Sequence, residues 1–262
     1  MSRIIAVANQ KGGVGKTTTT VILGSGLAAQ GYNTLLADLD SQGHICHMLN
    51  LPKSGGVKRW FYDEEPLDQL IVKARPNLWV LPGDKTTERV IGKIRDESYG
   101  EEAFAEMLKE QTKAFDVILL DLAPSLSNLQ VAALIASQYI LIPTRLRFTD
   151  LDGVQEVMRS LQQIARHGHK PRDYFILPTF FDRVANETVT RLRELVAAFG
   201  SHVWPPVVQD IKVAEAPGHG LTLWEHAPSC NALLGYPNGN GQRVGGYAHA
   251  LERLAVLMEG LD

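Results

Sequence analysis

The chain of 262 residues is 45% hydrophobic and 21% charged, and its formal net charge is −3. This length and composition suit one large α/β domain, or at most two small ones, and exclude a mainly disordered chain. The total charge does not suggest a strongly basic nucleic-acid-binding protein. Two cysteines, Cys46 and Cys230, are too few for a disulfide framework and fit a reducing compartment.

The N-terminal residues 1–8 lack the charged region and the long apolar core of a signal peptide. No stretch of the chain approaches the roughly 18 apolar residues that a membrane-spanning helix needs. We therefore expect a soluble, cytoplasmic protein.

Short apolar runs alternate with longer helical patterns along the chain. The runs that predict strands are residues 3–8, 34–40, 116–122, 138–143 and 173–178. Helices are predicted over residues 16–30, closed by Gly31, over 150–167 with Asp150 as N-cap, and over 186–199 and 246–260. Strands that alternate with helices indicate a doubly wound α/β fold, with a mostly parallel sheet and helices on both faces. Residues 235–246 are predicted to be a surface loop.

The first strand is followed by the segment NQKGGVGKTT, residues 9–18. A phosphate-binding loop needs glycines that let backbone N–H groups face the phosphates, and a helix N-terminus with its partial positive charge. It also needs a lysine for the β and γ phosphates and a hydroxyl for Mg²⁺. Gly12, Gly13, Gly15, Lys16 and Thr17 supply these groups at the start of a predicted helix.

The strict pattern G-x-x-x-x-G-K-[ST] nevertheless fails, because its first glycine would fall at Gln10. A second lysine, Lys11, precedes the glycines instead. A turn with incidental lysines is the alternative interpretation, and the coincidence of strand, glycines, Lys–Thr pair and helix disfavours it.

Carboxylates stand at the ends of two other predicted strands. Asp38 and Asp40 end the second strand, and Asp121 ends the run VILLD. Ligands of open α/β sheets bind beyond the carboxyl ends of strands, where carboxylates can hold Mg²⁺ or position a water molecule. Each aspartate alone would equally suit solvation or helix capping, and their combination with the loop favours a site.

Three segments together resemble one protein family. They are KGGVGKTTT, DLDSQ and VILLDLAPSL, and they resemble the deviant Walker A ATPases of the ParA/MinD group. Residues 214–220, AEAPGHG, are similar to the S-E-A-P-S-H-G stretch of the ParA branch. The resemblance covers nearly the whole chain, and it implies a single ParA-like ATPase domain over residues 1–262.

The resemblance implies that ATP and magnesium are the cofactors and that the protein forms a homodimer on ATP. Lys11 matches the signature lysine that reaches the partner's nucleotide, as an arginine finger does. Lys16 matches the lysine on the β and γ phosphates, and Asp40 the carboxylate that orients the attacking water. These three are the implied catalytic residues, and hydrolysis would be slow and stimulated by a partner.

The resemblance also implies binding residues. Thr17 would be a Mg²⁺ ligand, and Asp38 and Asp121 would act on the metal through water. The implied nucleotide-binding residues are Lys11, Gly12, Gly13, Val14, Gly15, Lys16, Thr17, Thr18 and Asp210.

The sequence departs from the family pattern in three places. Ser41 stands where the family usually has proline, and Leu122-Ala123 replaces the usual small residue and proline. Val208 stands at a common proline near the adenine, and Asp210 at the usual asparagine.

ParA relatives bind DNA without sequence preference through basic residues. Lys212 matches a basic position of the family. A second basic position of the family falls one residue after Arg183, and Arg191 and Arg193 follow on the next predicted helix. Residues 166–193 hold six Lys or Arg against three Asp or Glu. Such residues need only charge to follow phosphates, and an ordinary solvated helix face is the alternative.

Three rival functions share the loop. A MinD-like membrane ATPase would need a basic amphipathic C-terminal helix, whereas this chain ends ERLAVLMEGLD and predicts a core-packing helix without membrane binding. An iron–sulfur reductase would need cluster cysteines that Cys46 and Cys230 do not supply. A P-loop biosynthetic synthetase would need a substrate pocket. The preferred hypothesis is a nucleoid-associated switch that moves plasmid, chromosome or protein cargo with a ParB-like or adaptor partner.

Overall fold

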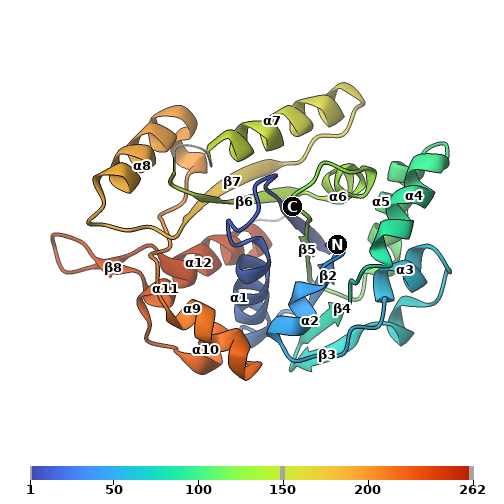
Figure 1. Ribbon diagram of the computed structural model, residues 1–262, viewed down its shortest axis with the longest axis horizontal. Coiled ribbons are helices and arrows are strands. Elements are labelled where there is room, and N and C mark those ends of the chain that lie inside the picture. Colours follow the sequence, from blue (N-terminus) through green and yellow to red (C-terminus); the bar gives the residue numbers. More distant parts are fainter. Residues whose placement is uncertain (1, 148–150, 260–262) are drawn as a thin grey trace.

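A twisted, mostly parallel sheet forms the centre of the protein. The computed structural model describes residues 2–147 and 151–259 (Figure 1). The strands of the seven-stranded sheet are β1 (Arg3–Val7), β2 (Thr34–Asp38), β3 (Val72–Arg75), β4 (Leu78–Leu81), β5 (Val117–Asp121), β6 (Tyr139–Arg145) and β7 (Asp173–Thr179). Their order is β3-β4-β2-β5-β1-β6-β7, and only β3 runs antiparallel to its neighbour. The predicted doubly wound fold is confirmed.

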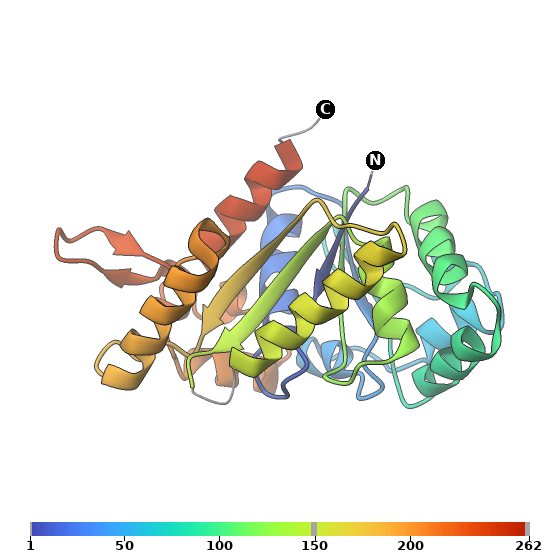
Figure 2. The same ribbon diagram turned by 90° about the horizontal axis from the view of Figure 1, so that it is seen from above.

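Helices cover both faces of the sheet. One face carries α1 (Lys16–Ala29), α2 (His44–Met48), α9 (Lys212–Glu215), α10 (Leu223–His226), α11 (Asn231–Leu234) and α12 (Gly246–Glu259). The other face carries α3 (Gly56–Phe61), α4 (Thr87–Asp96), α5 (Gly100–Gln111), α6 (Asn128–Ala136), α7 (Leu151–Arg166) and α8 (Asn186–Phe199). Short 3₁₀ turns are η1 (Leu67–Gln69), η3 (Gly200–His202) and η4 (Ala216–His219). Figures 1 and 2 show α7 and α8 on one side of β6 and β7, with α1 and α12 on the other.

The core consists of two apolar layers, one on each side of the sheet. In β1, Ile4 and Ala6 face one layer, and Ile5 and Val7 face the other. Because the strand is buried on both faces, its sequence is a continuous apolar run without polar alternation. This is why the central strands were predictable from the sequence.

The long helices lie close to their predicted bounds. The structure gives α8 the predicted residues, and Gly31, with φ 97°, follows the end of α1. The predicted N-cap Asp150 lies outside the described residues. In α12 the Tyr247 hydroxyl is buried 3.1 Å from the Thr19 hydroxyl of α1, so this helix packs into the core as expected. Among the described residues, no helix is long and apolar enough to cross a bilayer.

Two regions differ from the prediction. The strands β3 and β4 were not expected. β3 is a half-exposed edge strand that carries Lys73 and Arg75, and β4 is an apolar run of only four residues. The segment 235–246 was expected to be a plain loop, and it forms a small hairpin of β8 (Tyr236–Pro237) and β9 (Arg243–Val244). The hairpin projects from the body of the protein beside α8 and α11 (Figures 1 and 2).

The second strand is shorter than predicted and ends at Asp38. The Asp38 carboxylate accepts hydrogen bonds from the backbone N–H groups of Asp40 (3.3 Å) and Ile45 (2.9 Å), which turns the chain toward α2. Two glycines pack against this turn. A methyl group on Gly83 would overlap the carbonyl oxygen of Asp38, and one on Gly43, where φ is 62°, would overlap the carbonyl of Gly83. The position of Asp38 therefore depends on close backbone packing.

We predict that Gly83→Ala lowers the free energy of unfolding by about 1–3 kcal/mol, because the added methyl must displace backbone rather than a flexible side chain. Gly92→Ala is the matched control. It lies inside α4 with open space around its Cβ position and should raise stability by about 0.5–1 kcal/mol. Denaturant unfolding measures both, and equal stability of the two variants would contradict this account of the turn.

Candidate functional site

The loop between β1 and α1 has the backbone conformation of an anion-binding loop. Gly13 and Gly15 adopt φ values of 70° and 92°, which only glycine adopts without strain. Gly15 is the N-cap of α1, and no side chain caps that helix terminus. The Lys16 ammonium donates a hydrogen bond to the carbonyl oxygen of Lys11 at 3.0 Å. The loop therefore presents a helix N-terminus and a lysine at one place.

Two hydrogen bonds attach this loop to the sheet, and a third lies within the loop. The buried Asn9 accepts a bond from the Lys11 backbone N–H at 2.9 Å and donates one to the carbonyl of Pro143 at 2.8 Å. The Thr179 hydroxyl, at the end of β7, donates to the carbonyl of Val14 at 2.8 Å. The ends of β6 and β7 thus hold the loop, and sequence reasoning missed the role of Asn9.

Lys11 lies between this loop and α7. It is half-buried, and a side chain on Gly153 of α7 would overlap the Asn9 amide and come within 2.9 Å of the Lys11 Cγ. No residue in 2–147 or 151–259 forms a hydrogen bond or ion pair with the Lys11 ammonium. The side chain is packed along its stem, and its charge is free of partners within the described parts of the chain.

Two buried carboxylates lie side by side at the ends of β2 and β5. Asp38 and Asp121 are paired in register, and neither is exposed. The Asp121 Oδ1 atom is 3.5 Å from the Thr20 hydroxyl of α1. The buried Oδ2 atom has no hydrogen-bond partner within 3.5 Å among the described residues, although the nearby Thr17 hydroxyl acts to lower the pKa of this carboxyl. Such an atom is costly to bury, and a cation would satisfy it.

Burial also changes the ionisation of this group of residues. It raises the pKa of Asp38 to about 7, and it raises the pKa of Asp121 well above the usual value, with the Asp38 charge adding to the effect. Burial lowers the pKa of Lys16, while Asp121 and Asp40 act in the opposite direction. Perturbed groups of both signs at one strand edge are typical of functional sites.

A cleft of about 630 Å³ opens in front of these groups. Its lining residues are Gly12, Gly13, Gly15, Lys16, Thr17, Thr18, Asp40, Ser41, Gln42, His44, His47, Met48, Ala123, Pro124, Ser125 and Phe180. The structure therefore brings the loop residues and Asp40 together in one cleft, with Asp38 and Asp121 buried at the strand ends behind it. Half-exposed Asp40 accepts a hydrogen bond from the Gln42 backbone N–H at 2.9 Å.

The residues present fit a nucleotide with magnesium. The glycine loop and Lys16 suit phosphates, and no atom lies within 4 Å of a Cβ position at Gly12 or Gly13. The Thr17 hydroxyl, together with the unsatisfied oxygen of Asp121, suits a hard cation.

Asp210 has backbone partners in the structure. Its carboxylate accepts bonds from the N–H groups of Lys212 (3.1 Å), Asn231 (3.0 Å) and Ala232 (3.4 Å), and so it joins the starts of α9 and α11. It also lines a small cavity beside Thr18. Its contact with a nucleotide stays a prediction.

The basic residues predicted to bind DNA are not equivalent. Lys212 pairs with Glu215 at 2.7 Å, and Arg191 pairs with Glu194 at 2.6 Å. Arg193 is exposed on α8 without a carboxylate partner among the described residues.

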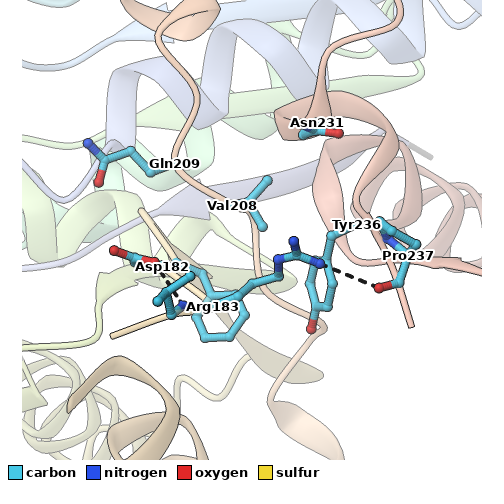
Figure 3. Close-up of a pocket in the computed structure, with 9 residues that line it drawn as sticks. Asp182, Arg183, Val208, Gln209, Asn231, Tyr236 and Pro237 are labelled. Carbon is cyan, nitrogen blue, oxygen red and sulfur yellow. Dashed lines mark hydrogen bonds between the residues drawn. The ribbon is translucent and has the colours of Figure 1, made fainter. Parts of the chain in front are cut away.

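Arg183 lines a cleft of about 520 Å³ between the β7–α8 connection and the β8–β9 hairpin. Figure 3 shows its side chain directed at the hairpin, where it donates a 3.5 Å hydrogen bond to the carbonyl of Pro237. Its guanidinium lies 5.2 Å from the centre of the Tyr236 ring. The Arg183 guanidinium therefore already has contacts within the protein and is less accessible to a DNA phosphate.

Two further residues at the strand ends were missed by sequence reasoning. Arg145 ends β6, and Phe180 directly follows β7 and lines the cleft. Their place directly at the carboxyl ends of predicted strands could have made them candidates, because ligands of such sheets bind there.

Comparison with known proteins adds the family. A family profile described as "AAA domain" matches residues 2–172. The chromosome-partitioning ATPase Soj of Thermus thermophilus is 35% identical over 89% of this chain and 92% of its own. The chain belongs to the ParA/Soj family of P-loop ATPases. Another relative within this family, the chromosome partitioning protein ParA of Caulobacter vibrioides, is 32% identical over 89% of this chain and 91% of its own.

Solved structures share the fold. An ATP complex of McdA from Cyanothece has a TM-score of 0.82 at 18% identity, covering 100% of this chain and 97% of its own. The cell division ATPase MinD of Pyrococcus furiosus has a TM-score of 0.75 at 17% identity, covering 98% and 100%. Cobyrinic acid a,c-diamide synthase of Mycobacterium smegmatis, with ADP and magnesium bound, has a TM-score of 0.73 at 26% identity, covering 87% and 96%. The first of these structures holds ATP, and the last holds ADP and magnesium.

We predict that Asp121→Asn stabilises the nucleotide-free protein, because it removes a buried charge. A carboxyl group whose pKa is raised on folding binds more protons in the folded state, so the wild type gains stability as the pH falls. At pH 8 the variant should melt about 2–8 °C higher than the wild type, and the gap should narrow toward pH 5.

With ADP and Mg²⁺ added, the order of the two melting temperatures should reverse. The wild type should then melt higher, since the variant lacks the carboxylate that suits the cation. Asp116→Asn, at the exposed position just before the same strand, is the control and should show no reversal. A variant that melts below the wild type in EDTA at pH 8 would contradict the account.

Proposed function

We propose that this protein is an ATP-hydrolysing switch that forms a homodimer on ATP and binds DNA without sequence preference as that dimer. A ParB-like or adaptor partner would stimulate slow hydrolysis, release the DNA, and so move a DNA or protein cargo. The arrangement that carries the proposal is Lys16 on the carbonyl of Lys11, with Asp40 in the same cleft and the buried pair Asp38 and Asp121 behind it. The Soj and ParA relatives support it.

Lys16 and the backbone N–H groups of the loop bind the phosphates in this proposal. Lys16 must leave the carbonyl of Lys11 to do so, and its lowered pKa reflects burial that a bound phosphate would compensate. Thr17 would hold Mg²⁺ directly, and Asp38 and Asp121 would hold it through water. When bound, magnesium neutralises charge on the phosphates and helps to align them.

Lys11 acts across the dimer in this proposal. A cation already in contact with its own loop could not reach the neighbouring subunit, whereas this ammonium has no partner in residues 2–147 or 151–259. The stem packed between the loop and Gly153 fixes its starting point. A lysine supplied by the other subunit makes each site complete only in the dimer.

Asp40 positions the attacking water. It is half-exposed in the cleft, whereas Asp38 and Asp121 are buried behind it. An accessible carboxylate beside the phosphate loop can accept a hydrogen bond from water and orient it in line with the phosphate.

DNA contact rests on residues that need only charge. Of the four predicted DNA-binding residues, Arg193 is the most accessible to a phosphate group. Lys212 and Arg191 have carboxylate partners, and Arg183 contacts the hairpin. Two copies in a dimer double the number of phosphate contacts, which makes binding depend on dimerisation. We place the protein in the cytoplasm on the nucleoid.

We predict that Lys11→Ala still binds ATP as a monomer and loses ATP-induced dimerisation. Light scattering with ATP and Mg²⁺ measures the mass, and Lys109→Ala, an exposed lysine on α5, is the control that should dimerise normally. An Lys11→Ala protein that dimerises like the wild type would overturn the role in trans.

Asp40→Ala should bind ATP and dimerise, and its hydrolysis should fall by about 100-fold or more, since water positioning contributes about 10²–10⁴-fold. On DNA the variant should remain bound after ATP addition for longer than the wild type. Phosphate release and DNA dissociation are measured. If Asp40→Ala hydrolyses ATP as fast as the wild type, another residue positions the water.

Arg193→Ala should weaken binding to any DNA sequence alike and reduce the salt slope by about one per subunit. Arg95→Ala is the control, because α4 lies at the opposite end of the molecule from α8 (Figure 1). Fluorescence anisotropy with ATP over a range of salt concentrations tests this. An unchanged slope, with dimerisation intact, would favour an ordinary solvated helix face.

A further inference from the structure

Phe180 is held in a strained conformation at the edge of the site. Its φ is 53°, in the left-handed region that bulky residues rarely adopt. The neighbours on both sides fix it there. The Thr179 hydroxyl donates to the carbonyls of Val14 (2.8 Å) and Thr144 (3.1 Å), and the Phe181 N–H donates to Val207 (2.9 Å). A strained backbone conformation of this kind persists only where surrounding contacts hold it in place, and such residues cluster at functional sites.

The strained backbone brings the Phe180 ring to the phosphate loop. A Cβ added to Gly15 would lie 3.6 Å from a ring carbon of Phe180. The ring lines the main cleft and also a cavity of about 30 Å³ beside Thr18, Val208 and Gln209. That cavity is smaller than any nucleobase, while the residue Phe180 as a whole is 37% exposed.

One face of the Phe180 ring is already covered. The Arg145 guanidinium carbon lies 3.9 Å from the ring centre, which is a cation–π contact. The Arg145 Nε atom is buried without a hydrogen-bond partner among the described residues. The contact with the ring is therefore the interaction that is seen to hold this guanidinium in place. Phe180 remains partly exposed in the cleft, where a ligand could contact it.

We propose that the nucleoside part of the bound nucleotide packs on Phe180 and that Arg145 is the positioning residue that holds the ring. The inference rests on the proposed function. An aromatic face repels phosphate and attracts the flat, apolar face of a base or the carbon face of a ribose. The phosphates occupy the glycine loop, so the nucleoside leaves the loop past Thr18, where the ring stands. Stacking reads no base edges, so this contact favours nucleotides over free phosphates without selecting one purine.

The test compares two probes with Mg²⁺, ADP and inorganic tripolyphosphate, by titration calorimetry. Phe180→Ala should bind ADP about tenfold more weakly and tripolyphosphate as the wild type does. Phe180→Gly should behave in the same way and melt higher than Phe180→Ala, because glycine relieves the strained φ. Phe180→Trp, which keeps an aromatic face, should retain ADP binding. Val184→Ala, an exposed residue of the same connection, is the control.

The outcomes separate this inference from the proposed function. A wild-type protein that binds neither probe would overturn the proposed function itself. If the wild type binds both probes and Phe180→Ala binds ADP normally, only the role of Phe180 is overturned. Equal weakening of both probes would also overturn it, because the ring would then merely support the phosphate loop.

Arg145 is tested through the same pair of probes. Arg145→Met keeps an unbranched apolar stem without the charge, and should weaken ADP binding alone, by less than Phe180→Ala does. Arg145→Lys, which keeps a cation for the ring, should bind ADP as the wild type does. If Arg145→Met and Arg145→Lys give the same ADP affinity, or if tripolyphosphate binding falls too, Arg145 does not act through the ring.

Discussion

Two aspartates end neighbouring strands with both carboxyl groups buried, and the rest of the site depends on them. Asp38 and Asp121 lie side by side in register, and one oxygen of Asp121 has no partner among the described residues. Like charges placed together in a dry environment raise each other's pKa and reduce the stability of the empty protein. A cation or a proton relieves that repulsion. The buried pair therefore lowers the stability of the empty protein and raises its affinity for a cation.

The surrounding backbone keeps the two carboxylates from moving apart. Asp38 accepts two backbone N–H groups, and Gly83 packs against its carbonyl so closely that no side chain fits between them. On the other side of the sheet centre, Asn9 and Thr179 attach the glycine loop to β6 and β7. A loop that is fixed at several points loses little conformational freedom when it binds phosphate. The site is thus largely formed before any nucleotide arrives.

Burial determines which parts of this structure were predictable from the sequence. The central strands have uninterrupted apolar runs, and a carboxylate that directly follows such a run stands at the edge of the sheet where ligands bind. The edge strand β3 carries charges and gives no such signal. Phe180 could not be identified either, because in the run TFF it has the same pattern as a buried strand residue. Only its left-handed backbone, which the sequence does not reveal, turns its ring to the phosphate loop.

The contact of α7 with the phosphate loop has an evolutionary consequence. Any side chain at Gly153 would displace the Asn9 amide, and that amide accepts the backbone N–H of Lys11. Position 153 can therefore enlarge only if position 9 becomes smaller, and the loop would then lose a bond that orients Lys11. The two positions, far apart in the chain, should change together or not at all among related sequences.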